Sequence, residues 1–393
     1  MKFASRIGRV QPSPTLAITA KAKQMKAEGI DVVSFGAGEP DFDTPEAVRE
    51  AAKRALDEGK TRYTPAAGIP ELRAAIARDY LRRGRTVTAD EVIVSVGGKH
   101  ALYNAMQVLF EKGDAVVIPA PYWVSYPAMV ELADADVIIA ETTIEADFNI
   151  TADGLRSILE ARQDVRGLVL CSPSNPTGSV YSADDLRALG AVLADYPNVL
   201  VLFDGMYDRL YYEGPFAPDF AQCNPELADR TLTFNGFSKT YAMTGWRLGY
   251  TIARKDIVSQ LNKLQSQSTS NATTFAQYGA LAALSLDDDV IERMRAVFVR
   301  RRDNIVAMLR EIPGVKCQVP DGAFYVFPDF SAYCGEGKRF ADDMHLSNYL
   351  LENALVAVVP GSAFGAEGCL RLSYATSDGL IEEGIKRIVD ALA

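Results

Sequence analysis

The chain has 393 residues, 48% hydrophobic and 23% charged, which is the composition of a globular protein long enough for two packed domains. Its net charge of −10 argues against a surface that binds nucleic acid or an anionic membrane, but it is compatible with local cationic pockets for small anions. No apolar run approaches the roughly 20 residues of a membrane span, and the first ten residues have no long apolar core, so we expect a cytoplasmic protein.

Residues that bind metals or form disulfides are few and scattered. The five cysteines are odd in number and lack the paired spacing of a zinc site or a disulfide framework, so we expect reduced thiols. With only His100 and His345 present, we expect neither a histidine-based metal site nor a histidine-dependent catalytic triad.

The first predicted elements lead into a glycine-containing turn. Residues 15–28 carry helical periodicity, and residues 31–35 are predicted to be a strand that ends in this turn. Thr44 is predicted to cap a helix that runs to about residue 59. Residues 63–68 then interrupt two helices.

Further along, a pattern recurs: a short apolar run, a polar loop with glycine or proline, and then a helix. This alternation is typical of an α/β protein with a mostly parallel sheet flanked by helices. Five runs are predicted to be strands, at residues 91–96, 115–118, 167–171, 199–203 and 231–234. Because ligands in open α/β sheets bind beyond the carboxyl ends of the strands, we expect the loops after these runs to converge on one crevice.

The last third of the chain changes character. A long helical stretch is predicted from residue 274 to about residue 311. Shorter elements follow, and we expect strands at residues 315–319, 323–327, 354–359 and 369–373 and a closing helix over residues 378–393. These elements predict a smaller α+β domain.

The stretch 236–250 places Lys239 among small residues directly after a predicted strand. A lysine amine can condense with an aldehyde to form a Schiff base, and small neighbours leave room for a flat cofactor. Arg247 follows eight residues later, and its planar guanidinium suits the phosphate of pyridoxal 5'-phosphate. Taken alone, these residues are better explained as an exposed loop with two solvated cations, so the rest of the chain decides.

Taken together and in order, the motifs of the chain resemble those of class I pyridoxal-phosphate-dependent aminotransferases, most closely the bacterial and plant aspartate and aspartate/prephenate branch. The likeness covers almost the entire length. Its motifs are residues 38–45, 97–99, 119–123 and 175–178, Asp204 with Tyr207, and residues 236–250 and 371–377. The resemblance implies fold type I: a large cofactor-binding domain over residues 45–285 and a small α+β domain over residues 286–393, to which residues 1–44 contribute.

The resemblance also implies a role for each residue around the cofactor ring. Lys239 would form the aldimine, and Asp204 would keep the pyridine nitrogen protonated. Tyr207 and Asn175 would hydrogen-bond the ring oxygen, and Trp123 would lie over the ring. The alternatives are structural: a carboxylate that caps a turn, an asparagine that makes one, and a tryptophan that belongs to the core.

The resemblance implies two further sets of binding residues, one for the cofactor phosphate and one for the substrate. Gly98 and the backbone of Lys99 open a helix whose free N–H groups would bind the phosphate together with Arg247. Tyr63 resembles the tyrosine that reaches the phosphate of a neighbouring subunit, which implies a homodimer with shared active sites. Without the resemblance, Tyr63 would be read as a surface residue.

For the substrate, Arg371 would bind the α-carboxylate, with the Gly38 backbone beside it and with Trp123 and Asn175 also in contact. Lys99 would meet the side-chain carboxylate of aspartate or glutamate. The alternative is an ordinary first-turn lysine, although a cation is unfavourable at a helix N-terminus unless an anion is present.

Two positions depart from the resembled pattern. Many relatives carry an acidic residue directly after the pyridine-binding aspartate, where this chain has Gly205, and we expect a changed rate with the same chemistry. Relatives that transaminate prephenate carry a lysine before Pro-Ser, where this chain has Gln11 before Pro12 and Ser13. This difference argues against activity on prephenate.

The function that follows is that of an aspartate aminotransferase. It would transfer the amino group of L-aspartate to 2-oxoglutarate through aldimine and ketimine steps in a ping-pong mechanism, giving oxaloacetate and L-glutamate. The alternatives are a prephenate, aromatic or alanine aminotransferase, a β-lyase, and, more distantly, a regulatory or binding protein built on the same fold. The expected partners are small amino and oxo acids and a second copy of the chain, not nucleic acid or a membrane.

Overall fold

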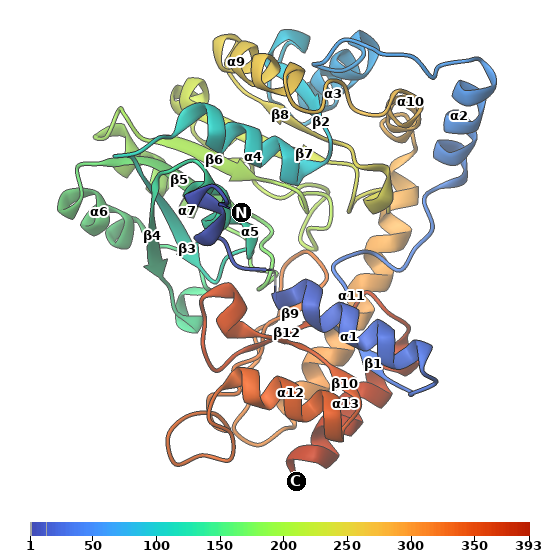
Figure 1. The fold of residues 1–393 in the computed structure, drawn as a ribbon, viewed down its shortest axis with the longest axis vertical. Coiled ribbons are helices and arrows are strands. Elements are labelled where there is room, and N and C mark those ends of the chain that lie inside the picture. The colour runs from blue at the N-terminus through green and yellow to red at the C-terminus, as the bar shows by residue number, and fades with distance from the viewer. Residues whose placement is uncertain (1, 13) are drawn as a thin grey trace.

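The computed structural model describes residues 2–12 and 14–393 and has two parts, a large α/β part and a smaller α+β part (Figure 1). Ser13, which follows Gln11 and Pro12, lies outside these residues. The long helix α11 (Asp288–Arg310) runs from the large part into the small one. None of the helices in the two described ranges is long and apolar enough to cross a membrane. The predicted fold class is confirmed.

The large part is built on a sheet of seven strands in the order β2-β8-β7-β6-β5-β3-β4. The strands are β2 (Val92–Ser95), β3 (Ala115–Ala120), β4 (Asp136–Glu141), β5 (Val165–Cys171), β6 (Leu200–Asp204), β7 (Thr231–Gly236) and β8 (Gly249–Ile252). Only β8 runs antiparallel to its neighbours, β2 and β7. The other pairs are parallel, so the carboxyl ends of β3, β5, β6 and β7 lie at one edge, as does that of β2.

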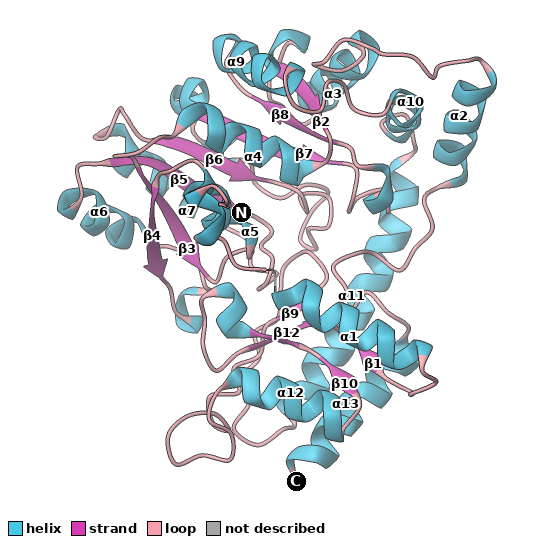
Figure 2. Ribbon diagram, in the orientation of Figure 1, coloured by secondary structure: helices cyan, strands magenta, loops and turns pink. Residues whose placement is uncertain are grey.

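Helices cover both faces of this sheet, which is why its central strands β5, β6 and β7 are buried almost throughout (Figure 2). One face packs against α4 (Gly98–Leu109), α5 (Ser125–Leu132) and α9 (Lys255–Ser266). The other packs against α6 (Ala152–Ala161), α7 (Ala183–Ala194) and α8 (Phe220–Cys223). A third cluster joins α2 (Glu46–Asp57), α3 (Pro70–Arg82) and α10 (Thr274–Ala283) to β2 and β8.

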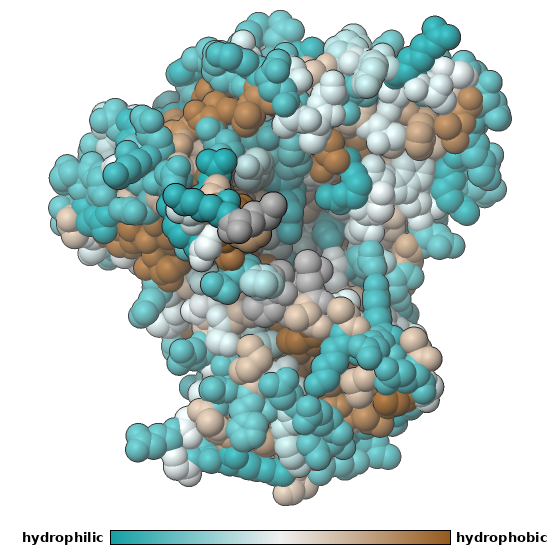
Figure 3. Space-filling model, viewed as in Figure 1, coloured by the Kyte–Doolittle hydropathy of each residue, from teal (hydrophilic) through white to brown (hydrophobic). Residues whose placement is uncertain are grey.

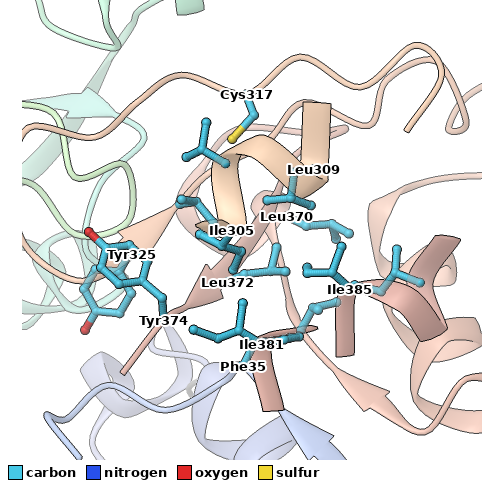
Figure 4. Close-up of a cluster of buried hydrophobic side chains, with 14 of the residues drawn as sticks. Phe35, Ile305, Leu309, Cys317, Tyr325, Leu370, Leu372, Tyr374, Ile381 and Ile385 are labelled. Carbon is cyan, nitrogen blue, oxygen red and sulfur yellow. The ribbon is translucent and has the colours of Figure 1, made fainter. Parts of the chain in front are cut away.

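The small part contains two short sheets and four helices. Strand β1 (Val33–Ser34) pairs with β10 (Val356–Ala357), so the N-terminal segment adds a strand here. The second sheet has the order β11-β12-β9, with β11 (Val359–Pro360), β12 (Leu370–Ser373) and β9 (Tyr325–Val326). The helices are α1 (Pro14–Ala27), α11, α12 (Asp343–Asn353) and α13 (Asp378–Leu392). Their core brings together Phe35, Ile305, Leu372 and Ile385, as Figure 4 shows.

Several predictions about local structure are wrong. The helix predicted over residues 274–311 is two helices, α10 and α11, because Asp288 and Asp289 lie in a first turn, where acidic residues favour a helix N-terminus. Residues 315–319 form only an isolated bridge, from Lys316 to Asp329, and the Cys317 carbonyl accepts a hydrogen bond from the Arg310 side chain. Residues 354–359 contain two short strands, β10 and β11, because the chain passes there from one sheet to the other.

Thr44 does not cap α2, which begins at Glu46 after Pro45 and has no side-chain cap. Its hydroxyl donates to the Ala242 carbonyl at 2.6 Å and accepts from Trp246 Nε1 at 3.1 Å. Both partners belong to the stretch 236–250. This threonine therefore fixes the N-terminal segment to the stretch that carries Lys239.

Candidate active site

A cavity of about 750 Å³ opens between the carboxyl edge of the large sheet and the small part. Figure 3 shows this face of the molecule hollowed between its upper and lower halves, with largely hydrophilic surroundings. The predicted site residues in its wall are Gly38, Gly98, Lys99, Trp123, Asn175, Asp204, Tyr207, Lys239, Arg247 and Arg371. The loops after β2, β3, β5, β6 and β7 each contribute to this wall, and Arg371 comes from β12 of the small part.

Lys239 lies just beyond the end of β7, and its amine donates a hydrogen bond to the backbone carbonyl of Gly38. Burial lowers the pKa of this amine to about 8, against the opposing effect of Glu39. The amine also lies 5.9 Å from the ring centre of Tyr207. A share of Lys239 is therefore neutral near neutral pH and able to act as a nucleophile or base.

Asp204 is the last residue of β6 and is buried. One carboxyl oxygen accepts from the Tyr126 hydroxyl at 2.7 Å, and the other accepts from the Met206 N–H at 3.1 Å. Burial raises the pKa of Asp204 to about 6, and no cation of the described chain forms an ion pair with it. An acid in this state suits a ligand that brings its own positive charge.

Arg371 is a buried guanidinium without a carboxylate partner among the described residues. Its NH1 donates to Asn175 Oδ1 at 3.0 Å, its NH2 donates to the Gly36 carbonyl at 3.1 Å, and its Nε has no partner. It lies 4.6 Å from the ring centre of Tyr325, whose hydroxyl is 3.1 Å from that of Tyr207. Burial lowers the pKa of Arg371, so an incoming carboxylate would relieve an uncompensated charge.

The start of α4 forms a cradle for an anion beside Arg247. Gly97 has a φ of +85°, and a Cβ placed on it would lie 2.5 Å from Arg247 NH2. A Cβ on Gly249 would lie 2.4 Å from the backbone nitrogen of Gly98. The two glycines thus let a helix N-terminus and a guanidinium approach each other, a combination that suits phosphate.

Lys99 and Trp123 lie side by side in the wall of the cavity. The Lys99 amine lies 4.9 Å from the ring centre of Trp123. Partial desolvation, followed by repulsion from Arg247, lowers the pKa of Lys99. No acidic side chain in the described part of the chain neutralises it, so this lysine is available to an anionic ligand.

Tyr63 is the one predicted site residue that the structure places outside this cavity. Its side chain is 89% exposed, but the loop that carries it is tightly held. Thr274 Oγ1 donates to the carbonyl before Tyr63 at 2.7 Å, Gln277 Nε2 donates to Thr64 Oγ1 at 3.3 Å, and Gln265 Nε2 donates to the carbonyl of residue 66 at 2.6 Å. The chain therefore presents an exposed aromatic side chain on a fixed loop.

Sequence reasoning missed Tyr126 and Tyr325, which contact Asp204 and Tyr207. Tyr126 lies three residues after Trp123, so its place on α5 was a usable signal. The sequence carries no such signal for Tyr325, because only the packing of the small part brings β9 to the cavity.

The two positions that depart from the resembled pattern lie elsewhere. Gln11 is exposed and does not line the cavity. Gly205 lines a second cavity of about 550 Å³, together with Asp208 and Asn235. Asp208 accepts from Asn235 Nδ2 at 2.7 Å and pairs with Arg83, so the loop that carries Tyr207 is anchored one residue further along.

Comparison with known proteins gives one consistent result. Residues 30–388 match the family described as aminotransferase class I and II. The chain is 45% identical to an aspartate aminotransferase of Geobacillus stearothermophilus and 44% identical to a probable aspartate/prephenate aminotransferase of Aquifex aeolicus, in each case over 99% of this chain and 98% of the relative.

Solved structures give the same match. The aspartate aminotransferase of Rhizobium meliloti superimposes with a TM-score of 0.95 at 42% identity, over 100% of this chain and 99% of that chain. The aspartate aminotransferase of Thermus thermophilus with maleate superimposes with a TM-score of 0.93 at 40% identity, over 100% of both chains.

Replacing Asp204 with asparagine tests whether burial raises the pKa of its carboxyl in the unliganded protein. Burial raises the pKa of Asp204 from 3.8 to about 6. Between these two pH values the native protein keeps the carboxyl proton, whereas the unfolded chain has released it. Stability is therefore lost as pH rises from about 4 to about 6. We expect Asp204→Asn to gain about 2–3 kcal/mol over wild type between pH 4 and pH 7, measured by urea unfolding.

The matched control is Asp195→Asn, at an exposed carboxyl, which should show no such gain. A difference between Asp204→Asn and wild type that did not change with pH would mean that burial does not raise the pKa of Asp204.

Proposed function

The chain belongs to the class I and II aminotransferases, and from this premise we propose that it transfers the amino group of L-aspartate to 2-oxoglutarate, giving oxaloacetate and L-glutamate. Relatives named aspartate aminotransferase support this choice over nearly the full chain. The single observation that carries it is the presence of Arg371 and Lys99 in one cavity without acidic partners among the described residues. Two such cations match the two carboxylates of the substrate.

We propose pyridoxal 5'-phosphate as the cofactor, because the residues present fit each of its parts. The glycine cradle with Arg247 fits the phosphate, and Asp204, buried without a cation partner among the described residues, fits a protonated ring nitrogen. Lys239 fits the aldehyde, since it is an amine whose pKa burial lowers to about 8. When bound, this cofactor supplies an aldehyde that condenses with amines and a ring that withdraws electrons from the substrate Cα.

The protein's own residues then orient the substrate and move its proton. Arg371 holds the α-carboxylate beside the Gly38 backbone, and Lys99 holds the side-chain carboxylate, so that the Cα–H bond has one fixed direction. Lys239 accepts the Cα proton, because a share of its amine is neutral near neutral pH. 2-Oxoglutarate occupies the same two cations in the second half of the reaction.

A second candidate substrate is prephenate, because relatives of this chain at 44–45% identity are named aspartate/prephenate aminotransferases. Prephenate is also a dicarboxylate and would meet Arg371 in the same way. Gln11, where a lysine is expected for this activity, lies outside the cavity wall and offers no cation. We therefore rank prephenate below aspartate.

We further propose a homodimer in which Tyr63 of each subunit reaches the phosphate site of the other. The support is the exposure of Tyr63 on a loop that buried glutamine side chains hold in place. An exposed tyrosine on a fixed loop loses little conformational freedom when it binds a partner.

The reaction is proposed to take place in the cytoplasm. All five cysteines are free thiols, which is what a reducing compartment maintains. Burial raises the pKa of Cys171, which lines the active-site cavity, to about 12, so this thiol is inert there.

A panel of the amino donors aspartate, glutamate and phenylalanine and the amino acceptor prephenate, run on wild type and on Lys99→Ala, tests the assigned reaction. Loss of a charge-assisted hydrogen bond costs about 2–3 kcal/mol, so we expect kcat/KM for aspartate to fall about 100-fold and that for phenylalanine to stay within a factor of about two. Lys53→Ala, at an exposed lysine paired with Glu50, serves as the control. Full retention of the aspartate preference in Lys99→Ala would show that another residue binds the side-chain carboxylate.

Mixed dimers of Tyr63→Phe and Lys239→Ala protomers test the shared site. If Tyr63 acts across the interface, each mixed dimer contains one intact site, and half of its sites should bind the cofactor as tightly as wild type. The Tyr63→Phe homodimer should bind it about 10-fold more weakly, as expected for one lost hydrogen bond. If no site of the mixed dimer binds the cofactor more tightly than the Tyr63→Phe homodimer does, the contact across the interface does not exist.

A further inference from the structure

One side of helix α1 forms part of the cavity wall. The residues of α1 in this wall are Thr15, Thr19, Ala22, Lys23 and Lys26. Their spacing of three or four residues places them on one side of the helix. The adjoining stripe, with Ile18 and Met25, packs on the small part. In Figure 1, α1 lies across the front of β9 and β12, below the large part.

Lys23 and Lys26 are exposed, and neither forms an ion pair with a described acidic residue. Lys21 differs from them although it lies on the same helix. It points away from the cavity wall and pairs with Glu352 at 3.2 Å. The two lysines at the cavity are thus the ones whose charge is left without a partner in the described structure.

The charge of the cavity is opposite to that of the protein. Its wall carries six cationic side chains, namely Lys23, Lys26, Lys99, Lys239, Arg247 and Arg371, and two acidic ones, Glu39 and Asp204. The whole chain has a net charge of −10, which repels anions from most of its surface. Four of the six cations have roles in the proposed reaction, whereas Lys23 and Lys26 have none.

We propose that Lys23 and Lys26 form a cationic rim that captures dianionic oxo acids and so favours dicarboxylic over monocarboxylic substrates at the encounter step. This inference rests on the proposed function and names two further specificity-determining residues for it. A rim of one charge sign in a cleft raises the local concentration of the oppositely charged ligand. The effect is larger for 2-oxoglutarate, with two negative charges, than for pyruvate, with one.

The double variant Lys23→Gln/Lys26→Gln tests the rim, with Lys21→Gln as the control on the same helix. At low ionic strength we expect kcat/KM for 2-oxoglutarate to fall about 10-fold, kcat to stay unchanged, and kcat/KM for pyruvate to change by less than about two-fold. At about 1 M salt, where the Debye length is about 3 Å, the variant and wild type should converge. Charge reversal, Lys23→Glu/Lys26→Glu, should enlarge the loss for the dianion.

Binding of maleate, an unreactive dicarboxylate, gives a readout that does not depend on turnover. Its association rate, followed by stopped-flow tryptophan fluorescence, should fall in the double variant with the same salt dependence. Equal losses of kcat/KM for 2-oxoglutarate and pyruvate, or no loss of kcat/KM in the double variant, would contradict the proposed role of Lys23 and Lys26. If wild type binds maleate in this salt-dependent way but does not transaminate 2-oxoglutarate, the proposed reaction fails and the rim stands.

Discussion

The structure depends on a small set of charged groups that are removed from water without a partner of opposite charge. Arg371 is 3% exposed with a free Nε, Asp204 is buried at the end of β6, and Lys239 is half-buried and donates to a backbone carbonyl. Burial of this kind destabilises a folded chain unless a ligand supplies the missing charges. The shifted pKa values of Asp204 and Lys239 have burial as their common cause.

Different features of the fold place each of these groups: strand pairing, close approach at glycines, and the packing of the small part against the large one. Parallel strand pairing brings the ends of β5, β6 and β7 to one edge, which places Asp204 and Lys239 near each other. Glycines 97 and 249 allow the close approach that forms the anion cradle. Arg371 comes from the other side, on β12, so the cavity exists only because the small part packs against the large one.

Much of this arrangement could be predicted from the sequence, because it depends on local signals. Short apolar strands followed by polar loops were enough to expect the sheet and the convergence of its loops at one edge, whereas the role of each residue there was implied by the resemblance to aminotransferases. The features that could not be predicted depend on contacts between residues far apart in the sequence. Thr44 binds Ala242 and Trp246 across the chain, and Tyr325 reaches Tyr207 only through the small part's packing. Lys23 was equally hidden, since helical periodicity does not reveal which side of α1 faces the cavity.

The central claim is that Lys239 is the residue that binds the cofactor covalently and moves the substrate proton. Reduction of the cofactor-loaded protein with borohydride makes a lysine–cofactor bond permanent, and peptide mass mapping then locates it. We expect the added mass on the peptide that contains Lys239, and no added mass in Lys239→Ala. Attachment at Lys99 or at another lysine, or no attachment at all, would contradict this account of the site.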